Sequence, residues 1–169
     1  MTKIVSERFH SELPQENAFL SLQVVVHDEW IDYNAHMTEW QYYKLLSDAC
    51  ENFLRALGFT EEYRRKGNTF FSAEGHLRNL KECRRGTSLN VYTEVLGTDH
   101  IRLHLYQYIV DVGRGITVAT GEHMLIHVDT TTRRANPVGP YMSECLKRAI
   151  STWNAPIKPR GMSSMVRVI

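Results

Sequence analysis

The chain has 169 residues, and its 20 Lys and Arg side chains nearly balance 19 Asp and Glu, which leaves a formal net charge of +1. This length favours one domain that buries its own core. The near-neutral charge gives no electrostatic footprint for nucleic acid, and no apolar run approaches the roughly 20 residues that span a membrane. The three cysteines lack CxxC spacing and the start "MTKIVSERFHSELPQENAF" is polar, so we expect a reduced, cytoplasmic protein.

The first half of the chain predicts an arm, a strand and a long helix. Residues 1–18 are polar and aperiodic, and we expect a flexible arm there. The β-branched run "SLQVVVH" at 21–27 predicts a strand. Apolar residues then recur with a 3.6-residue period over 38–57, which predicts a helix that Gly58 ends. Thr38 and Gln41 have the spacing of a capping box at its start.

The second half predicts an antiparallel sheet. Period-two alternation runs through 69–81, 88–96, 101–110 and 116–128, and the breaks "RRGT", "GTDH" and "DVGRG" have turn composition. A helix is expected at 141–153 and a tail at 154–169. An amphipathic sheet must bury one face, and the helix at 38–57 is the only large candidate. We therefore expect an α+β fold, an antiparallel sheet wrapped round one long central helix, in a domain covering 19–153.

One segment before the long helix resembles a known motif. Asp32-Tyr33-Asn34-Ala35-His36-Met37 is similar to the D-x-N-G-H-(M/V) turn of hotdog-fold acyl-CoA thioesterases of the 4-hydroxybenzoyl-CoA thioesterase type. "LKECRRGTSLNVYTEV" and "VATGEHMLIHVDTTTRRANPV" resemble that family's later strands, so the resemblance covers about residues 20–138. Within the group, "EWIDYNAHM", "AEGHLRNLKE" and "LIHVDTTTRRANP" look most like betainyl-CoA thioesterases of carnitine breakdown. Ala35 replaces the usual Gly, and Thr38-Glu39 replaces a frequent Asn-Asn.

The resemblance implies a hotdog fold and hydrolysis of a small acyl-CoA, most specifically betainyl-CoA to glycine betaine and CoA. It makes Asp32 the nucleophile or general base, and it implies a homodimer or a tetramer with sites between protomers. The residues alone leave another interpretation open, since Asp is also favoured in turns and at helix starts. Asp48 and Glu51 of the helix are alternative catalytic carboxylates.

Thioester hydrolysis also needs donors for the developing oxyanion. The backbone N–H groups of Thr38, Glu39 and Trp40 lack intrahelical partners and lie at the positive end of the helix dipole. Asn34 and His36 either position water and the carbonyl or hold the turn together. Glu74 and His76 are two apart in a strand and share a face, which lines the cleft or carries an exposed charge pair.

Rings and arginines complete the candidate site. Trp30, Tyr33, Trp40, Tyr42 and Tyr43 either pack round the helix start or, for a quaternary ammonium substrate, form an aromatic cage. Arg84, Arg85, Arg133 and Arg134 are candidates for the CoA phosphates, or ordinary charges of solvated turns.

No cofactor is expected besides the CoA thioester. We expect no metal, because His100/His104 and His123/His127 are four apart in strands, a span of about 13 Å that is too long for two ligands of one ion. Competing functions are a general hotdog thioesterase, a hotdog hydratase or dehydratase, and a non-catalytic acyl-CoA-binding domain.

Overall fold

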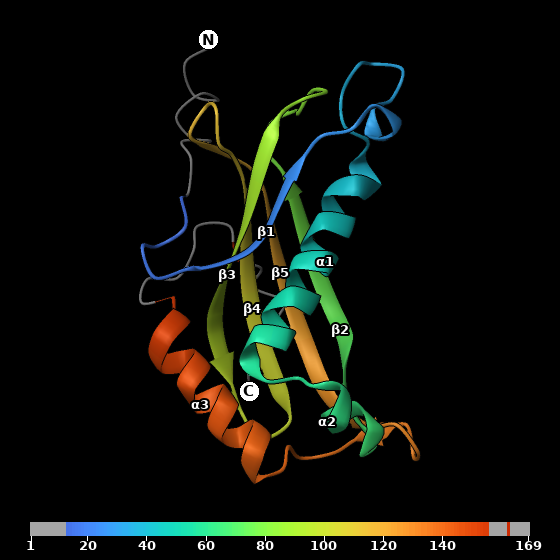
Figure 1. Cartoon of the computed structure of the whole chain (residues 1–169), viewed down its shortest axis with the longest axis vertical. Coiled ribbons are helices and arrows are strands. Elements are labelled where there is room, and N and C mark those ends of the chain that lie inside the picture. Colours follow the sequence, from blue (N-terminus) through green and yellow to red (C-terminus); the bar gives the residue numbers. More distant parts are fainter. Residues whose placement is uncertain (1–12, 156–161, 163–169) are drawn as a thin grey trace.

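The computed structural model describes residues 13–155 and Met162. Five strands form one sheet in the order β1 (Phe19–Val25), β3 (Ser88–Thr98), β4 (Arg102–Asp111), β5 (Ile116–Asp129) and β2 (Asn68–Asn79), with a short β6 (Arg134–Ala135) on β5. The helices are α1 (Glu39–Leu57), α2 (Glu61–Arg65) and α3 (Pro140–Trp153), and a 3-10 turn, η2, spans Asp28–Trp30. All pairings within the sheet are antiparallel, and α1 lies diagonally across one face (Figure 1).

The predicted α+β hotdog architecture is confirmed, and each predicted strand and helix overlaps an observed one. The short α2 was not predicted, because its charged segment has no apolar period. It forms because the Thr60 side chain accepts a hydrogen bond from the Tyr63 N–H at 3.1 Å and so caps its start. The expected arm and tail lie largely outside the described residues.

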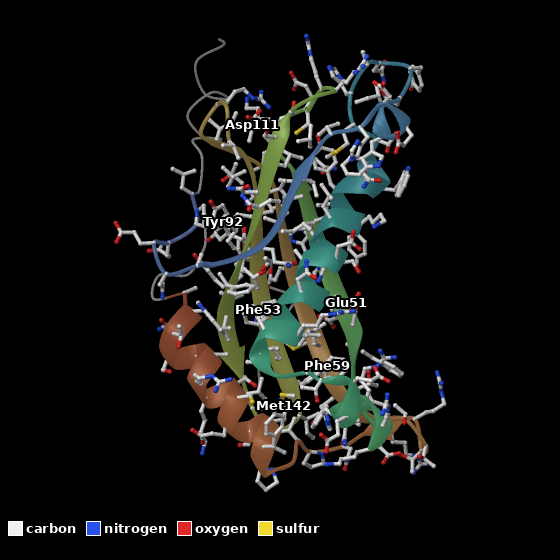
Figure 2. All side chains as sticks on the ribbon, in the orientation of Figure 1. Glu51, Phe53, Phe59, Tyr92, Asp111 and Met142 are labelled. Atoms are coloured by element: carbon white, nitrogen blue, oxygen red, sulfur yellow. The ribbon has the colours of Figure 1, made fainter. Side chains whose placement is uncertain are left out.

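Helix α1 packs on the sheet through direct contact with β5. Leu46 of α1 is fully buried, and a Cβ built on Gly121 would lie 2.5 Å from its Cδ1. Only a glycine lets the helix approach this closely. Phe53 and Leu57 continue the buried stripe toward the part of the core shared with α3, where Figure 2 shows Phe53 beside the sheet. Gly58 ends α1 with a φ of 120°, as its position predicts.

The opposite face of the sheet is also buried. Tyr106, Tyr108 and Val110 of β4 form a cluster there against which Met162 packs. His104 and Glu122 pair on this face at 2.8 Å, both with nearly no exposed side-chain surface. The long strands therefore alternate between two buried faces, which explains why the described part of β4 is buried over almost its whole length.

Two expectations from composition concerned the cysteines and membrane-spanning segments. Cys50, Cys83 and Cys145 are free and buried. Within the described residues, no helix is both long and apolar enough to cross a membrane.

Replacing Gly121 with Ala tests the contact between α1 and β5. The added Cβ must displace buried Leu46, and we expect the free energy of unfolding to fall by about 1–3 kcal/mol. Chemical denaturation measures the change. Gly113→Ala is the control, since its Cβ would meet only ordinary contact distance, 3.5 Å from Asp111 Oδ1. Equal effects of the two substitutions would show that the close approach is not a constraint.

Candidate active site

A compact turn joins η2 to α1 and is built round Asp32. Ile31 and Met37 form an isolated antiparallel bridge, and Asp32 N–H donates to the His36 carbonyl at 2.8 Å. The Asp32 side chain closes the turn from inside, because its Oδ1 accepts the N–H groups of Asn34 at 2.8 Å and His36 at 3.3 Å. Asp32 is thus a turn residue, which is one of the two interpretations that the sequence left open.

This structural role uses only one carboxylate oxygen. No described residue donates a hydrogen bond to Asp32 Oδ2, and the side chain is partly exposed. One oxygen therefore holds the turn while the other is available to a substrate or a water molecule. The two interpretations of Asp32 are compatible in this geometry.

The Gly-to-Ala departure in the motif falls on a strained residue. Ala35 has a φ of 60°, in the left-handed region where L-residues other than glycine are disfavoured. Its N–H donates to the Asp32 carbonyl at 3.0 Å, so the turn holds Ala35 in this conformation. The motif's usual glycine corresponds to a backbone requirement that Ala35 meets at some cost.

Helix α1 begins at Glu39, directly after this turn, with Thr38 as its N-cap. The predicted capping box is wrong: Thr38 Oγ1 and both side-chain amide atoms of Gln41 are buried without a hydrogen-bond partner among the described residues. The Thr38 N–H instead donates to the Trp30 carbonyl at 2.8 Å. That bond removes Thr38 from the expected oxyanion donors and leaves the N–H groups of Glu39 and Trp40, which bond to no acceptor in the described residues.

Gln41 was not predicted as a site residue, yet its side-chain amide is buried without a hydrogen-bond partner among the described residues. Gln41 has only 1% exposed surface, and a buried polar group without a partner destabilises a fold unless water or a ligand binds it. The sequence does not show whether a Gln in the first turn of a helix is buried or whether its amide has a partner. Its position in that turn places a spare hydrogen-bonding group close to the helix N-terminus.

Asn34 and His36 lie on the exposed side of the turn, and His36 is close enough to Glu82 to affect it electrostatically. The Glu82 carboxyl accepts its own backbone N–H, and with the nearby charges of His36, Arg114 and Arg84 this holds its pKa below the usual range. Met37 N–H donates to the Cys83 carbonyl at 2.8 Å, which fixes the turn against this segment. Glu82 is a carboxylate that the motif analysis missed.

The expected aromatic residues do not converge within one chain. Tyr33 is 96% exposed and Trp40 61% exposed, whereas Trp30 packs against the core and edge-on to His27. Tyr42 is a core residue, not a ligand-binding ring: its hydroxyl donates to the Lys81 carbonyl at 3.3 Å and accepts the Cys83 N–H at 3.1 Å. Burial raises the Tyr42 pKa, so its hydroxyl stays protonated.

Tyr43 is the ring that lines a cavity. The cavity has a volume of about 520 Å³ and lies between α1 and the start of β2, with Tyr43, Glu51, Phe59, Phe70 and His123 among its lining residues. Glu51 and Phe59 are seen toward the α2 end of α1 in Figure 2. His123 was considered only as a metal ligand, but its Nε2 is buried without a partner, its ring lies 5.5 Å from that of Tyr43, and burial lowers its pKa.

Glu74 and His76 share a face, as predicted, but it is not the face of this cavity. They pair in register with Met124 and Glu122, whereas Gly75 pairs with His123 on the α1 side. Directly opposite residues of antiparallel strands point to the same side of the sheet. Glu74 and His76 therefore face away from this cavity, because a period of two fixes the shared face without saying which face it is.

The four candidate arginines divide between the two ends of the molecule. Arg84 and Arg85 adjoin the Asp32 turn, and Arg85 pairs with Asp28 at 2.7 Å. Arg84 lines a cavity of about 400 Å³ with Glu82, Asp111 and Arg114. Arg133 lies in the turn after β5 and Arg134 begins the short β6, beside α2 at the other end of α1 (Figure 1). One chain does not bring the two pairs together.

The remaining histidines have other partners. His104 pairs with Glu122, and His127 contacts the Tyr63 hydroxyl at 2.7 Å and the Asn136 carbonyl at 2.6 Å. In the described part of the chain, no three His, Cys, Asp or Glu side chains gather closely enough to hold a metal ion.

A sheet wrapped on one helix, with an Asp-containing turn at the helix start, is the arrangement of a hotdog thioesterase. Residues 26–146 match the Thioesterase-like superfamily, and the chain belongs to that family. It is 33% identical to a betainyl-CoA thioesterase of Pseudomonas aeruginosa over 121 residues, which is 71% of this chain and 74% of that protein. It is also 35% identical, over 99% of its own length, to an L-carnitine dehydrogenase/betainyl-CoA thioesterase of Agrobacterium fabrum, but covers only 35% of that protein.

Solved structures agree on the fold. A hypothetical protein of Staphylococcus aureus in complex with CoA superposes with a TM-score of 0.80 at 23% identity, over 90% of this chain and 97% of that one. A putative thioesterase of Pseudomonas putida gives 0.74 at 26% identity, with the same coverage of 90% and 97%. The family resemblance expected from the motif is thereby confirmed.

Ala35→Gly tests the strain in the Asp32 turn. The left-handed conformation costs an alanine about 1–2 kcal/mol, of which the greater freedom of glycine in the unfolded chain offsets about 0.4–1 kcal/mol. We expect a net gain in unfolding free energy of about 0.5–1 kcal/mol by denaturant titration. Ala56→Gly, in helix α1, is the control and should lose about 1 kcal/mol. A similar loss at Ala35 would argue against strain there.

Proposed function

We propose that this protein is an acyl-CoA thioesterase that hydrolyses betainyl-CoA to glycine betaine and CoA. The observation that carries the proposal is the Asp32 turn, which leads into the N-terminus of α1 and leaves one carboxylate oxygen and the first helical N–H groups without partners among the described residues. Membership of the Thioesterase-like superfamily supports the reaction, and the names of the relatives support the substrate. The chain spans only about a third of the dehydrogenase-fused relative from Agrobacterium fabrum, so the substrate is carried over as part of the proposal.

The carboxylate has two routes to thioester cleavage. As a general base, Asp32 takes a proton from water while the water oxygen bonds to the carbonyl carbon. As a nucleophile, Asp32 attacks that carbon itself and forms an anhydride that water then cleaves. In both routes the C–S bond breaks, CoA leaves as a thiolate that takes up a proton, and the acyl group leaves as a carboxylate.

Both routes place negative charge on the thioester oxygen. The N–H groups of Glu39 and Trp40 are free to donate to that oxygen, and the helix dipole adds to their effect. The buried Gln41 amide supplies a further hydrogen bond in the same helical turn, to the oxyanion or to the attacking water. His36 lies near Glu82 on the solvent side of the turn, where it would orient a water molecule or the substrate.

The acyl group is assigned to the cavity lined by Tyr43. Tyr43 follows Glu39 by four residues, so its ring lies one helical turn from the oxyanion donors on the same side of α1. The rings of Tyr43, Phe59 and Phe70 suit a quaternary ammonium, each worth about 0.5–2 kcal/mol when well placed. Burial keeps His123 uncharged at this cavity, so the charged groups among its lining residues are the carboxylate of Glu51 and the guanidinium of Arg64.

The active molecule is proposed to be a two-fold dimer paired through β2. This strand is a sheet edge of twelve residues, and its centre, from Phe71 to Gly75, is exposed. An open edge of this length invites pairing with another strand. The other edge, β1, has seven residues, and its Ser21 carbonyl already accepts the Asn52 side chain at 3.0 Å.

Free-thiol release from a panel of acyl-CoAs tests the reaction. With betainyl-, acetyl-, 4-hydroxybenzoyl- and medium-chain acyl-CoA, we expect betainyl-CoA to react fastest. Asp32→Asn should lower kcat by about 10²–10⁴-fold, since the amide cannot act as base. Its oxygen can still accept the two turn N–H groups, so thermal unfolding should change little.

The other outcomes of this experiment are also informative. Equal activity on all substrates would leave a general thioesterase and remove the role of the aromatic cavity. Hydration of an enoyl-CoA without thiol release would identify a hydratase, and tight CoA-ester binding without turnover would identify a binding domain. An unimpaired Asp32→Asn enzyme would transfer the catalytic role to another carboxylate, with Glu51 the first to test.

Sedimentation velocity tests the dimer. Near a two-fold axis each residue meets its own counterpart, so Ala73→Asp at the centre of β2 places like charges close together. We expect the wild type to sediment as a dimer or larger and Ala73→Asp to shift toward monomer at micromolar concentration. Thr152→Asp, on an exposed part of α3, is the matched charge control. A wild-type monomer would refute the pairing.

A further inference from the structure

His123 is a buried histidine to which the proposed mechanism gives no hydrogen bond. It lies on β5 and faces α1, since it pairs in register with Gly75 of β2, where a Cβ would meet the Tyr43 ring. Only 3% of its surface is exposed, and its Nε2 has no hydrogen-bond partner among the described residues. Buried polar atoms are paired in most folded proteins, so we expect a water molecule or a ligand to pair with this nitrogen.

Two other buried histidines of the sheet have partners within the chain. His104 pairs with the Glu122 carboxylate at 2.8 Å, and the His127 Nε2 lies 2.7 Å from the Tyr63 hydroxyl. Both side chains therefore hold neighbouring elements of the fold together. His123 makes no such bond through its Nε2, which separates it from the histidines that only stabilise the core.

His123 lines the cavity of about 520 Å³ that is assigned to the acyl group. Its ring lies 5.5 Å from that of Tyr43, which follows Glu39 by one helical turn, or about 6 Å along α1. The hydroxyl groups of Ser47 and Ser72 belong to the same lining, so the cavity is not purely apolar. An acyl group whose carbonyl is held at the Glu39 N–H would therefore pass the imidazole a few carbons beyond that carbonyl.

A hydroxyl group on the acyl chain matches this imidazole. Burial lowers the pKa of His123, so the ring is neutral, and its Nε2 is a donor in one tautomer and an acceptor in the other. A hydroxyl group both donates and accepts, so it can pair with Nε2 in either tautomer. The betainyl group has no hydrogen-bonding atom beyond its carbonyl, and it leaves this capacity of the cavity unused.

We propose that His123 determines specificity at this cavity, and that the protein also hydrolyses short acyl-CoA thioesters that carry a hydroxyl group on the third or fourth carbon. This inference rests on the proposed function, since it uses the same Asp32 turn and adds a second class of substrate. The bonds that form and break are those of thioester hydrolysis, and the hydroxyl group is unchanged. A site that hydrogen-bonds a substrate hydroxyl discriminates against the analogue that lacks it, because the buried partner is then left unpaired.

A matched set of substrates tests the hydroxyl group. Free-thiol release is measured with butyryl-, 3-hydroxybutyryl- and 4-hydroxybutyryl-CoA, which have acyl chains of the same length. We expect the kcat/KM of the wild type to be about tenfold or more higher for at least one hydroxylated ester than for butyryl-CoA. Equal kcat/KM for all three esters, or a preference for butyryl-CoA, would overturn the proposal.

Substitution of His123 tests the residue, and the ratio of two substrates excludes a general loss of stability, which lowers both rates alike. His123→Phe keeps a flat ring that cannot hydrogen-bond and should reduce the preference to about twofold or less. His123→Gln keeps a donor and an acceptor and should restore part of the preference. His100→Phe, exposed between β3 and β4, is the matched control and should keep it whole. An undiminished preference in His123→Phe would refute this role.

Binding without turnover separates this inference from the proposed function. Calorimetric titration of the Asp32→Asn protein compares its affinity for butyryl-CoA and for the two hydroxylated esters, and the comparison is repeated with His123→Phe added. Tighter binding of a hydroxylated ester that needs His123, in a protein whose wild type releases no thiol, would support the site and reject the thioesterase. Thiol release from betainyl-CoA with no preference for the hydroxyl group in binding or in turnover would do the reverse.

Discussion

The contact of Leu46 with Gly121 fixes helix α1 on the sheet, and the other features of the site depend on it. Because a side chain at 121 would meet Leu46, the helix lies directly on the backbone of β5, and the sheet curves round it. This position determines where α1 begins and which of its faces meets the edge strand. Tyr42 enters the core and Tyr43 the cavity as a consequence of the same helical rotation. The Asp32 turn is then bound to the segment between β2 and β3, because the Met37 N–H donates to the Cys83 carbonyl.

The structural role of Asp32 in its turn leaves room for the chemical role proposed for it. Its Oδ1 accepts two backbone N–H groups and its backbone accepts a third, so the carboxylate is held in one orientation before any substrate arrives. A catalytic group that is already oriented loses little entropy when it reacts. The strain at Ala35 belongs to the same arrangement, since the hydrogen bonds round Asp32 keep that residue in the left-handed region. The capping role that the structure shows for Asp32 is therefore compatible with the catalytic role proposed for it.

The sequence predicted the fold well because the fold depends on periodicity. Alternation over β2 to β5 and the 3.6-residue period of α1 are local signals that survive in the structure. The site was harder to predict, because it depends on which face of the sheet or of helix α1 a side chain occupies. Glu74 and His76 share a face, as their spacing requires, but only the register with β5 shows that the face is turned from α1. Tyr42 and Tyr43 are neighbours in sequence with equal chemistry, and only the packing of α1 separates a core ring from a cavity ring.

Sequence motifs do not show how charged residues that are far apart in the chain are arranged in space. Arg84-Arg85 and Arg133-Arg134 look equivalent as dipeptides, yet the fold carries them to opposite ends of α1. Within the described part of one chain, the Asp32 turn lies near Arg84 and Arg85 and far from Arg133 and Arg134. The proposed two-fold dimer would place the start of β2 in one copy beside the end of β2 in the other. The exposed edge of β2 is the element that the proposed dimer would pair, since an open edge of twelve residues is a liability in a monomer.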